Sequence, residues 1–215
     1  MGSSESPDAA APGKRPDEER SLPDSSIPPV VMILPQLAAN DEDLGQLCDK
    51  AGISIEKALE NRVGILFRML GYEVEPLGQG HGRAPDGVAK SREYHYAIVY
   101  DTKARKDAYT MGTDDRAARE YINSVGEQLR KEGIKTLYFA IISSRFSGDH
   151  DDIIRGLKIE TEVREVLLIE AAALLVLLEG KFRDPTLTLG PDGIQRLLAA
   201  SGPLTEADAR EFIGI

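Results

Sequence analysis

The chain has 215 residues and a net charge of −10, with 41% hydrophobic and 29% charged residues. This length suffices for one well-packed domain and is too short for two large ones, and the balance excludes a wholly disordered or fibrous chain. No run approaches the roughly 18 apolar residues of a membrane-spanning helix. Residues 1–29 lack the apolar core of a secretory signal, and Cys48 has no partner for an internal disulfide. We therefore expect a cytoplasmic protein that does not contact a membrane.

The pattern predicts a disordered N-terminal arm over 1–29 and one folded domain over 30–215. The arm is rich in Ser, Pro and mixed charge and has no apolar periodicity. Beyond it, apolar residues at helical spacing alternate with β-branched runs. We expect helices at 41–51, 54–70, 113–132, 151–161, 171–179, 194–200 and 206–212, and strands at 72–76, 94–100, 136–143 and 163–169. This order predicts an α/β fold with a mixed central sheet flanked by helices.

Basic charge is concentrated in one short stretch. Between Arg83 and Lys106 there are six basic and three acidic residues, a local charge of +3 in an acidic chain. The overall charge argues against a general nucleic-acid binder, because phosphate contacts need Lys and Arg. The local reversal makes Arg83, Arg105 and Lys106 candidates for phosphate contact, and solvated loop charges are an equally weighted alternative.

One group of polar residues in this stretch has the composition of a catalytic site. Pro85-Asp86-Gly87 precedes the strand at 94–100, and Asp101-Thr102-Lys103 follows it. Alternation along a strand directs Asp101 and Lys103 to the same side, and Asp86 can lie across the ladder on a neighbouring strand. Two carboxylates supply the hard oxygen ligands that Mg²⁺ prefers, and a nearby lysine can orient water or stabilise developing charge. The spacing therefore suits metal-assisted phosphodiester hydrolysis.

These residues resemble the PD-(D/E)XK nuclease motif, and more narrowly the cleavage domain of the type IIS restriction endonuclease FokI. The similarity covers roughly residues 55–190 and is mostly collinear. The matching stretches are Gly71-Tyr72, Leu77-Gly78, Pro85-Asp86-Gly87, 96–104, Tyr109, Tyr121, Ile142-Ser143, Phe146-Ser147-Gly148, a leucine-rich stretch after Val163, and Thr186-Leu187-Thr188. The resemblance implies a restriction-endonuclease-like fold.

The resemblance also implies roles for individual residues. Asp86 and Asp101 would hold Mg²⁺, for which Mn²⁺ can substitute, and Lys103 would be the catalytic lysine. An acidic residue on the first long helix often joins the metal shell in the wider superfamily, and Glu60 is the candidate here. A solvent-facing charge is the competing interpretation of Glu60.

The FokI-type domain acts as a dimer through an Asp and an Arg one turn apart on the helix after the catalytic lysine. Aligning Tyr121 with the family tyrosine assigns those positions to Arg116 and Glu120, with the signs exchanged. Such a pair can be self-complementary across a two-fold axis. An exposed pair within one helix is the alternative interpretation.

The sequence thus predicts a metal-dependent DNA endonuclease of the restriction or defence type, acting as a homodimer on double-stranded DNA. We expect no sequence-recognition module of its own, so a separate targeting subunit is a possible partner. The alternatives are a catalytically silent nuclease-fold interaction module, and a nuclease for branched DNA or RNA. The metal chemistry acts on phosphate and not on the base, so the motif does not separate the substrates.

Overall fold

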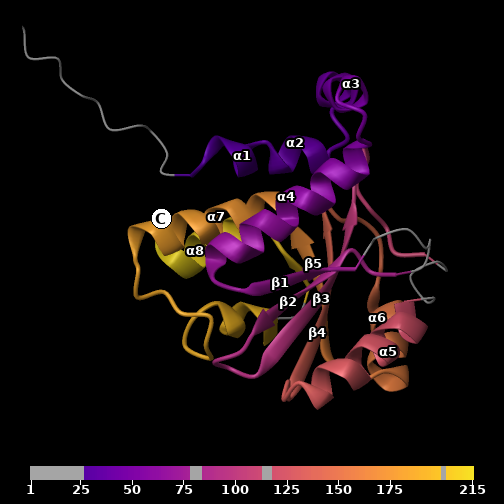
Figure 1. The fold of residues 1–215 in the computed structure, drawn as a ribbon, viewed down its shortest axis with the longest axis vertical. Coiled ribbons are helices and arrows are strands. Elements are labelled where there is room, and N and C mark those ends of the chain that lie inside the picture. Colours follow the sequence, from indigo (N-terminus) through magenta and orange to yellow (C-terminus); the bar gives the residue numbers. More distant parts are fainter. Residues whose placement is uncertain (1–26, 78–83, 113–117, 200–201) are drawn as a thin grey trace, which may run out of the picture.

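The computed structural model describes residues 27–77, 84–112, 118–199 and 202–215, without the side chain of Tyr121. A six-stranded sheet with the order β1-β2-β3-β4-β5-β6 forms its centre (Figure 1). The first three strands pair antiparallel, and β3 to β6 pair parallel. The strands are β1 (Glu73–Pro76), β2 (Gly87–Ser91), β3 (Tyr96–Lys103), β4 (Thr136–Ser143), β5 (Val163–Glu170) and β6 (Pro203–Leu204). The predicted α/β fold with a mixed sheet is confirmed.

Helices cover both faces of the sheet (Figure 1). One layer holds α1 (Pro29–Met32), α2 (Leu34–Ala38), α4 (Ile55–Leu70), α7 (Ala171–Arg183), the 3-10 helix η2 (Ile194–Ala199) and α8 (Glu206–Ile213), and α3 (Glu42–Lys50) extends from it. The opposite layer holds α5 (Ala118–Lys131) and α6 (Asp151–Glu160). Alternating residues of β3 supply the two cores: Ile98 and Tyr100 face the α4 side, and Ala97 and Val99 face the α5 side.

The helix caps follow the sequence signals. The Ser54 hydroxyl accepts the Lys57 N–H at 3.2 Å, so α4 begins there, and Gly71 ends it in a left-handed conformation with φ of 110°. Asp41 caps α3 in the same way by accepting the Leu44 N–H at 3.0 Å. The predicted start and end of α4 are therefore confirmed.

Several boundaries differ from those predicted. The strand predicted at 94–100 begins at Tyr96, after a turn, and continues to Lys103, because the parallel pairing with β4 extends from Tyr96 opposite Thr136 to Lys103 opposite Ser143. The helix α7 continues to Arg183, and the helix predicted at 194–200 is a 3-10 helix. The helices α1 and α2 and the strands β2 and β6 have no counterpart among the predicted elements.

The folded part begins ahead of the predicted boundary at residue 30. Ile27 is buried in the core on the α4 side, and α1 begins at Pro29. The rest of the predicted arm lies outside the described residues. Within the described ranges, each helix falls short of the length and apolar character needed to span a bilayer.

Candidate active site

The three predicted catalytic residues lie at one edge of the sheet. Asp101 and Lys103 are at the carboxyl end of β3, and Asp86 immediately precedes β2. Because β2 runs antiparallel to β3 with Gly87 opposite Tyr100, the chain at Asp86 lies opposite Asp101. The backbone N–H of Asp86 donates to the Tyr100 carbonyl at 3.0 Å, which continues the ladder by one residue. Antiparallel pairing therefore brings the start of β2 to the end of β3.

The carboxylate of Asp86 is held by Thr102. Its Oδ2 accepts the backbone N–H of Thr102 at 2.7 Å and the Thr102 hydroxyl at 2.6 Å. Thr102 is buried, and no other hydrogen bond reaches this carboxylate from the described residues. Both donors reach the same oxygen, and within the described residues Oδ1 accepts no hydrogen bond.

Lys103 is fixed at both its side chain and its backbone. Its Nζ lies 2.7 Å from Oδ2 of Asp101, and the two side chains are 25% and 16% exposed. Its carbonyl accepts the hydroxyl of Ser143, which is fully buried on β4, at 2.8 Å. The ammonium group is therefore oriented by a carboxylate and still reaches solvent, where a substrate can approach it.

The electrostatics connect Glu60 to the same site. Burial raises the pKa of Asp86 above its ordinary value of 3.8, and the negative charge of Glu60 raises it further. The hydrogen bonds from Thr102 and the positive charge of Lys103 lower this pKa but do not cancel the effect of burial. Glu60 is 8% exposed on α4, where it pairs with Lys57. The interpretation of Glu60 as a solvent-facing charge is therefore wrong, because helix packing against the sheet buries it.

Tyr100 fills the space beneath these carboxylates because two glycines admit it. A Cβ on Gly87 would lie 2.4 Å from the Tyr100 hydroxyl oxygen, and one on Gly64 of α4 would lie 3.3 Å from it. Burial, followed by the charges of Asp86 and Glu60, raises the pKa of Tyr100 above its ordinary value, so the phenol stays protonated. The glycine after Asp86 is thus required by the ring that packs against it.

The described residues contain no group of three or more His, Cys, Asp or Glu side chains that could hold a metal ion. The donor chemistry nevertheless fits a hard cation. Asp86 has an oxygen without a donor in the described part, and the charge of Glu60 acts on it in a buried setting. A divalent cation would neutralise such neighbouring carboxylates. The full ligand set of Asp86, Asp101 and Glu60 stays a prediction.

The predicted peripheral residues are only partly described. Arg83 and Arg116 lie outside the described residues. Arg105 and Lys106 are exposed just after β3, and the Lys106 Nζ lies 2.6 Å from Glu42 of α3. Glu120 is exposed in the first turn of α5. The predicted pairing of Arg116 with Glu120 therefore stays untested.

The sequence did not predict the residues that hold Asp86, Asp101 and Lys103 in place. Thr102 lies between Asp101 and Lys103, but alternation along the strand places its side chain on the other face, so it was not predicted to support the site. Tyr100 ends the apolar run of β3, where it resembles an ordinary core residue. The glycine after Asp86 is the one sequence feature that indicates a large side chain packed against this point. Ser143 ends the next strand, so only the register between β3 and β4 connects it to Lys103.

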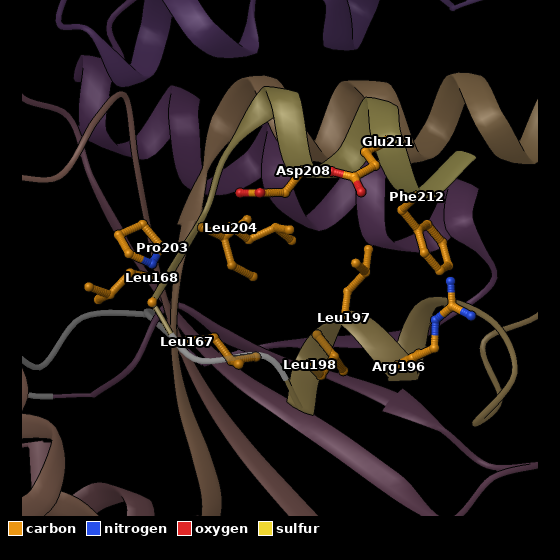
Figure 2. Close-up of a pocket in the computed structure, with 12 residues that line it drawn as sticks. Leu167, Leu168, Arg196, Leu197, Leu198, Pro203, Leu204, Asp208, Glu211 and Phe212 are labelled. Atoms are coloured by element: carbon orange, nitrogen blue, oxygen red, sulfur yellow. The ribbon is translucent and has the colours of Figure 1, made fainter. Parts of the chain in front are cut away.

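A cavity of about 460 Å³ lies elsewhere in the molecule (Figure 2). It is lined by β5, η2, β6 and α8, with Leu167, Leu197 and Leu204 among its apolar walls and Arg196 stacked on the ring of Phe212 at 4.9 Å. β5 and β6 are separated from β3 by β4 in the sheet. The cavity is therefore separate from the candidate active site.

The Pro-Asp step before β2, the Asp-Thr-Lys end of β3 and the mixed sheet define a PD-(D/E)XK-like nuclease fold of the restriction-endonuclease type. The chain belongs to the family of FokI cleavage domains: the family model described as "FokI, cleavage domain" matches residues 40–199.

Two solved structures of restriction endonuclease FokI resemble the fold. One, of FokI, has a TM-score of 0.61 and 20% identity and covers 80% of this chain; the other, of FokI bound to DNA, has a TM-score of 0.59 and 19% identity and covers 81%. The match spans 30% of each FokI chain. No curated protein matches the sequence.

Proposed function

We propose that this domain is a metal-dependent DNA endonuclease that hydrolyses backbone phosphodiesters as a dimer and without its own sequence recognition. The observation that carries the proposal is the meeting of Asp86, Asp101 and Lys103 at one sheet edge in a chain of the FokI cleavage-domain family. One of the two similar structures is that of FokI bound to DNA, which supports DNA as the substrate.

In this proposal the carboxylates hold the metal ion and the lysine acts on the water or the phosphate. The Asp86 carboxylate, oriented by Thr102, and the Asp101 carboxylate would hold Mg²⁺ or Mn²⁺, with Glu60 adding negative charge nearby. A bound cation would supply charge neutralisation at the phosphate and activation of water. Lys103, oriented by Asp101, donates hydrogen bonds to a water or to a phosphate oxygen as charge develops there.

Two further parts of the proposal concern partners. One active site hydrolyses one strand at a time, so we expect two copies of this domain to act together when both strands of a duplex are cut. Glu120, exposed on α5, and Arg116 are the proposed contact. The described helices and strands all belong to the sheet or to the layers packed on it, which supports a separate targeting subunit or region as the source of sequence recognition.

The test is cleavage of supercoiled plasmid at low salt, in Mg²⁺, in Mn²⁺ and in EDTA. We expect nicking and linearisation that require the metal, rise more steeply than first order in protein, and disappear in Lys103→Ala. Lys135→Ala is the matched control, because Lys135 is exposed at the amino end of β4, at the opposite edge of the sheet. Equal activity of the Lys103 and Lys135 variants would refute the assignment of Lys103. Absence of cleavage by the wild type in either metal would favour a binding module, and branched DNA and RNA substrates would test the other alternative.

A further inference from the structure

The segments that leave β3 and β4 lie side by side next to the candidate site. These strands are parallel, and Lys103 is paired with Ser143 at their carboxyl ends. Two residues beyond each member of this pair stand Arg105 and Arg145. The Ser144 hydroxyl donates to the Arg105 carbonyl at 3.3 Å, so the two segments remain adjacent past the end of the sheet.

Backbone hydrogen bonds join the same two segments further along. The N–H of Tyr109 donates to the Arg145 carbonyl at 2.8 Å, and the N–H of Ser147 donates to the Tyr109 carbonyl at 3.0 Å. The Thr110 hydroxyl donates to the Ser147 carbonyl at 2.8 Å. The rings of Tyr109 and Phe146 meet edge to face, with centroids 6.2 Å apart. The backbones that carry both arginines are therefore held in place before any ligand binds.

Within the part of the chain that the structure describes, Arg105 and Arg145 have no acidic partner, unlike Lys103 and Lys106 beside them. Both are exposed, and neither forms an ion pair within the described ranges. Lys103 is paired with Asp101 and Lys106 with Glu42. Among the described residues, the Arg105 guanidinium donates one hydrogen bond, to the Ala104 carbonyl at 3.2 Å, and its remaining donors meet no partner there.

We propose that Arg105 and Arg145 form a phosphate clamp for double-stranded DNA beside Lys103. The clamp rests on the proposed nuclease function and deepens it. Arg105 is already a phosphate-contact candidate from the sequence, and the structure adds Arg145 as its partner on the neighbouring segment. A guanidinium presents a planar fork of donors that matches phosphate oxygens, and two of them on a preset backbone fix the strand relative to the catalytic lysine. Contacts of this kind orient a duplex without reading its sequence.

Binding of a fluorescently labelled DNA duplex, followed by anisotropy in EDTA across a salt series, tests the clamp. Each phosphate contact contributes about 0.9 to the slope of log K against log salt. We expect Arg145→Gln and Arg105→Gln each to lower this slope by about that amount, and Arg145→Lys to keep the slope while binding more weakly. The matched control is Arg164→Gln: Arg164 is also exposed and without an ion pair in the described part, but it lies at the amino end of β5, at the opposite edge.

The outcomes separate the clamp from the nuclease itself. If the wild type cleaves plasmid in Mg²⁺ while the Arg145 and Arg164 variants share one slope, the clamp is wrong and the proposed function stands. If the wild type neither binds the duplex nor cleaves plasmid, both fail. A slope reduced in the Arg105 and Arg145 variants alone, with unchanged thermal unfolding, supports the clamp.

Discussion

Replacing Thr102 by valine removes one hydrogen bond to Asp86 and changes little else. Valine keeps the branched shape of threonine, and the backbone N–H of residue 102 still donates to Oδ2. The lost contact is the hydroxyl bond of 2.6 Å. This length falls in the range of charge-assisted O–H···O⁻ bonds, which are roughly twice as strong as neutral ones.

The expected cost follows from that bond. A hydrogen bond to a charged group contributes about 1.5–3 kcal/mol, and the short, buried bond here belongs in the upper part of the range, about 2–3 kcal/mol. If the carboxylate must be held in this orientation during cleavage, the rate at subsaturating metal falls roughly 30- to 150-fold. The hydroxyl also helps to lower the pKa of Asp86 against burial and the charge of Glu60. Its removal raises that pKa, so the acid limb of the cleavage profile moves to higher pH.

The assay has two readouts, with Thr102→Ser as the matched control that keeps the hydroxyl. Plasmid cleavage across Mg²⁺ concentration and pH gives the metal midpoint and the acid limb. The rise in melting temperature on adding Ca²⁺ reports cation binding independently of turnover. We expect Thr102→Val to need more metal in both readouts and Thr102→Ser to stay near the wild type. A Thr102→Val protein with the wild-type midpoint and acid limb would refute the orienting role.

Two other substitutions test the packing and the electrostatics of the site. Gly87→Ala should lower the free energy of unfolding in urea by about 1–3 kcal/mol, because the added Cβ would lie 2.4 Å from the Tyr100 hydroxyl oxygen. Gly45→Ala is the control, because a Cβ at Gly45 of α3 meets open space and should not destabilise the protein. Equal effects of the two substitutions on the free energy of unfolding would contradict the packing argument. Asp86→Asn should abolish cleavage and raise the melting temperature at pH 7. Because the pKa of Asp86 is raised in the folded state, its contribution to stability is fully present below pH 3.8 and is lost as pH rises through the folded-state pKa. The gain in melting temperature from Asp86→Asn should therefore vanish in acid. A melting temperature of Asp86→Asn below that of the wild type at pH 7 would contradict this reasoning.

The elements that the sequence predicts best are those whose signals are local. α4 begins and ends where Ser54 and Gly71 predict, because capping depends on a few adjacent residues. β2 is the opposite case. All its residues are buried, yet it contains Lys90, which is 3% exposed and pairs with Glu75 and Glu132. A buried lysine with one partner on β1 and another just after α5 interrupts the apolar run by which a strand is predicted.

The residues of the candidate site also fall into those that the sequence predicts and those that it does not. The Pro-Asp and Asp-Thr-Lys steps are short motifs, so Asp86, Asp101 and Lys103 could be named from the sequence. Thr102, Ser143 and Arg145 depend on which strands are neighbours and in what register. No periodicity within one strand contains that information.

The mixed direction of the sheet is what assembles the site. The carboxyl ends of β3 and β4 meet at one edge because these strands are parallel, which brings Ser143 to Lys103. Asp86 stands at the amino end of its strand, so it reaches that edge only because β2 is antiparallel to β3. A parallel β2 would carry Asp86 to the opposite edge, away from Thr102. The antiparallel pairing of β2 with β3 is therefore a requirement of the proposed site as well as a feature of the fold.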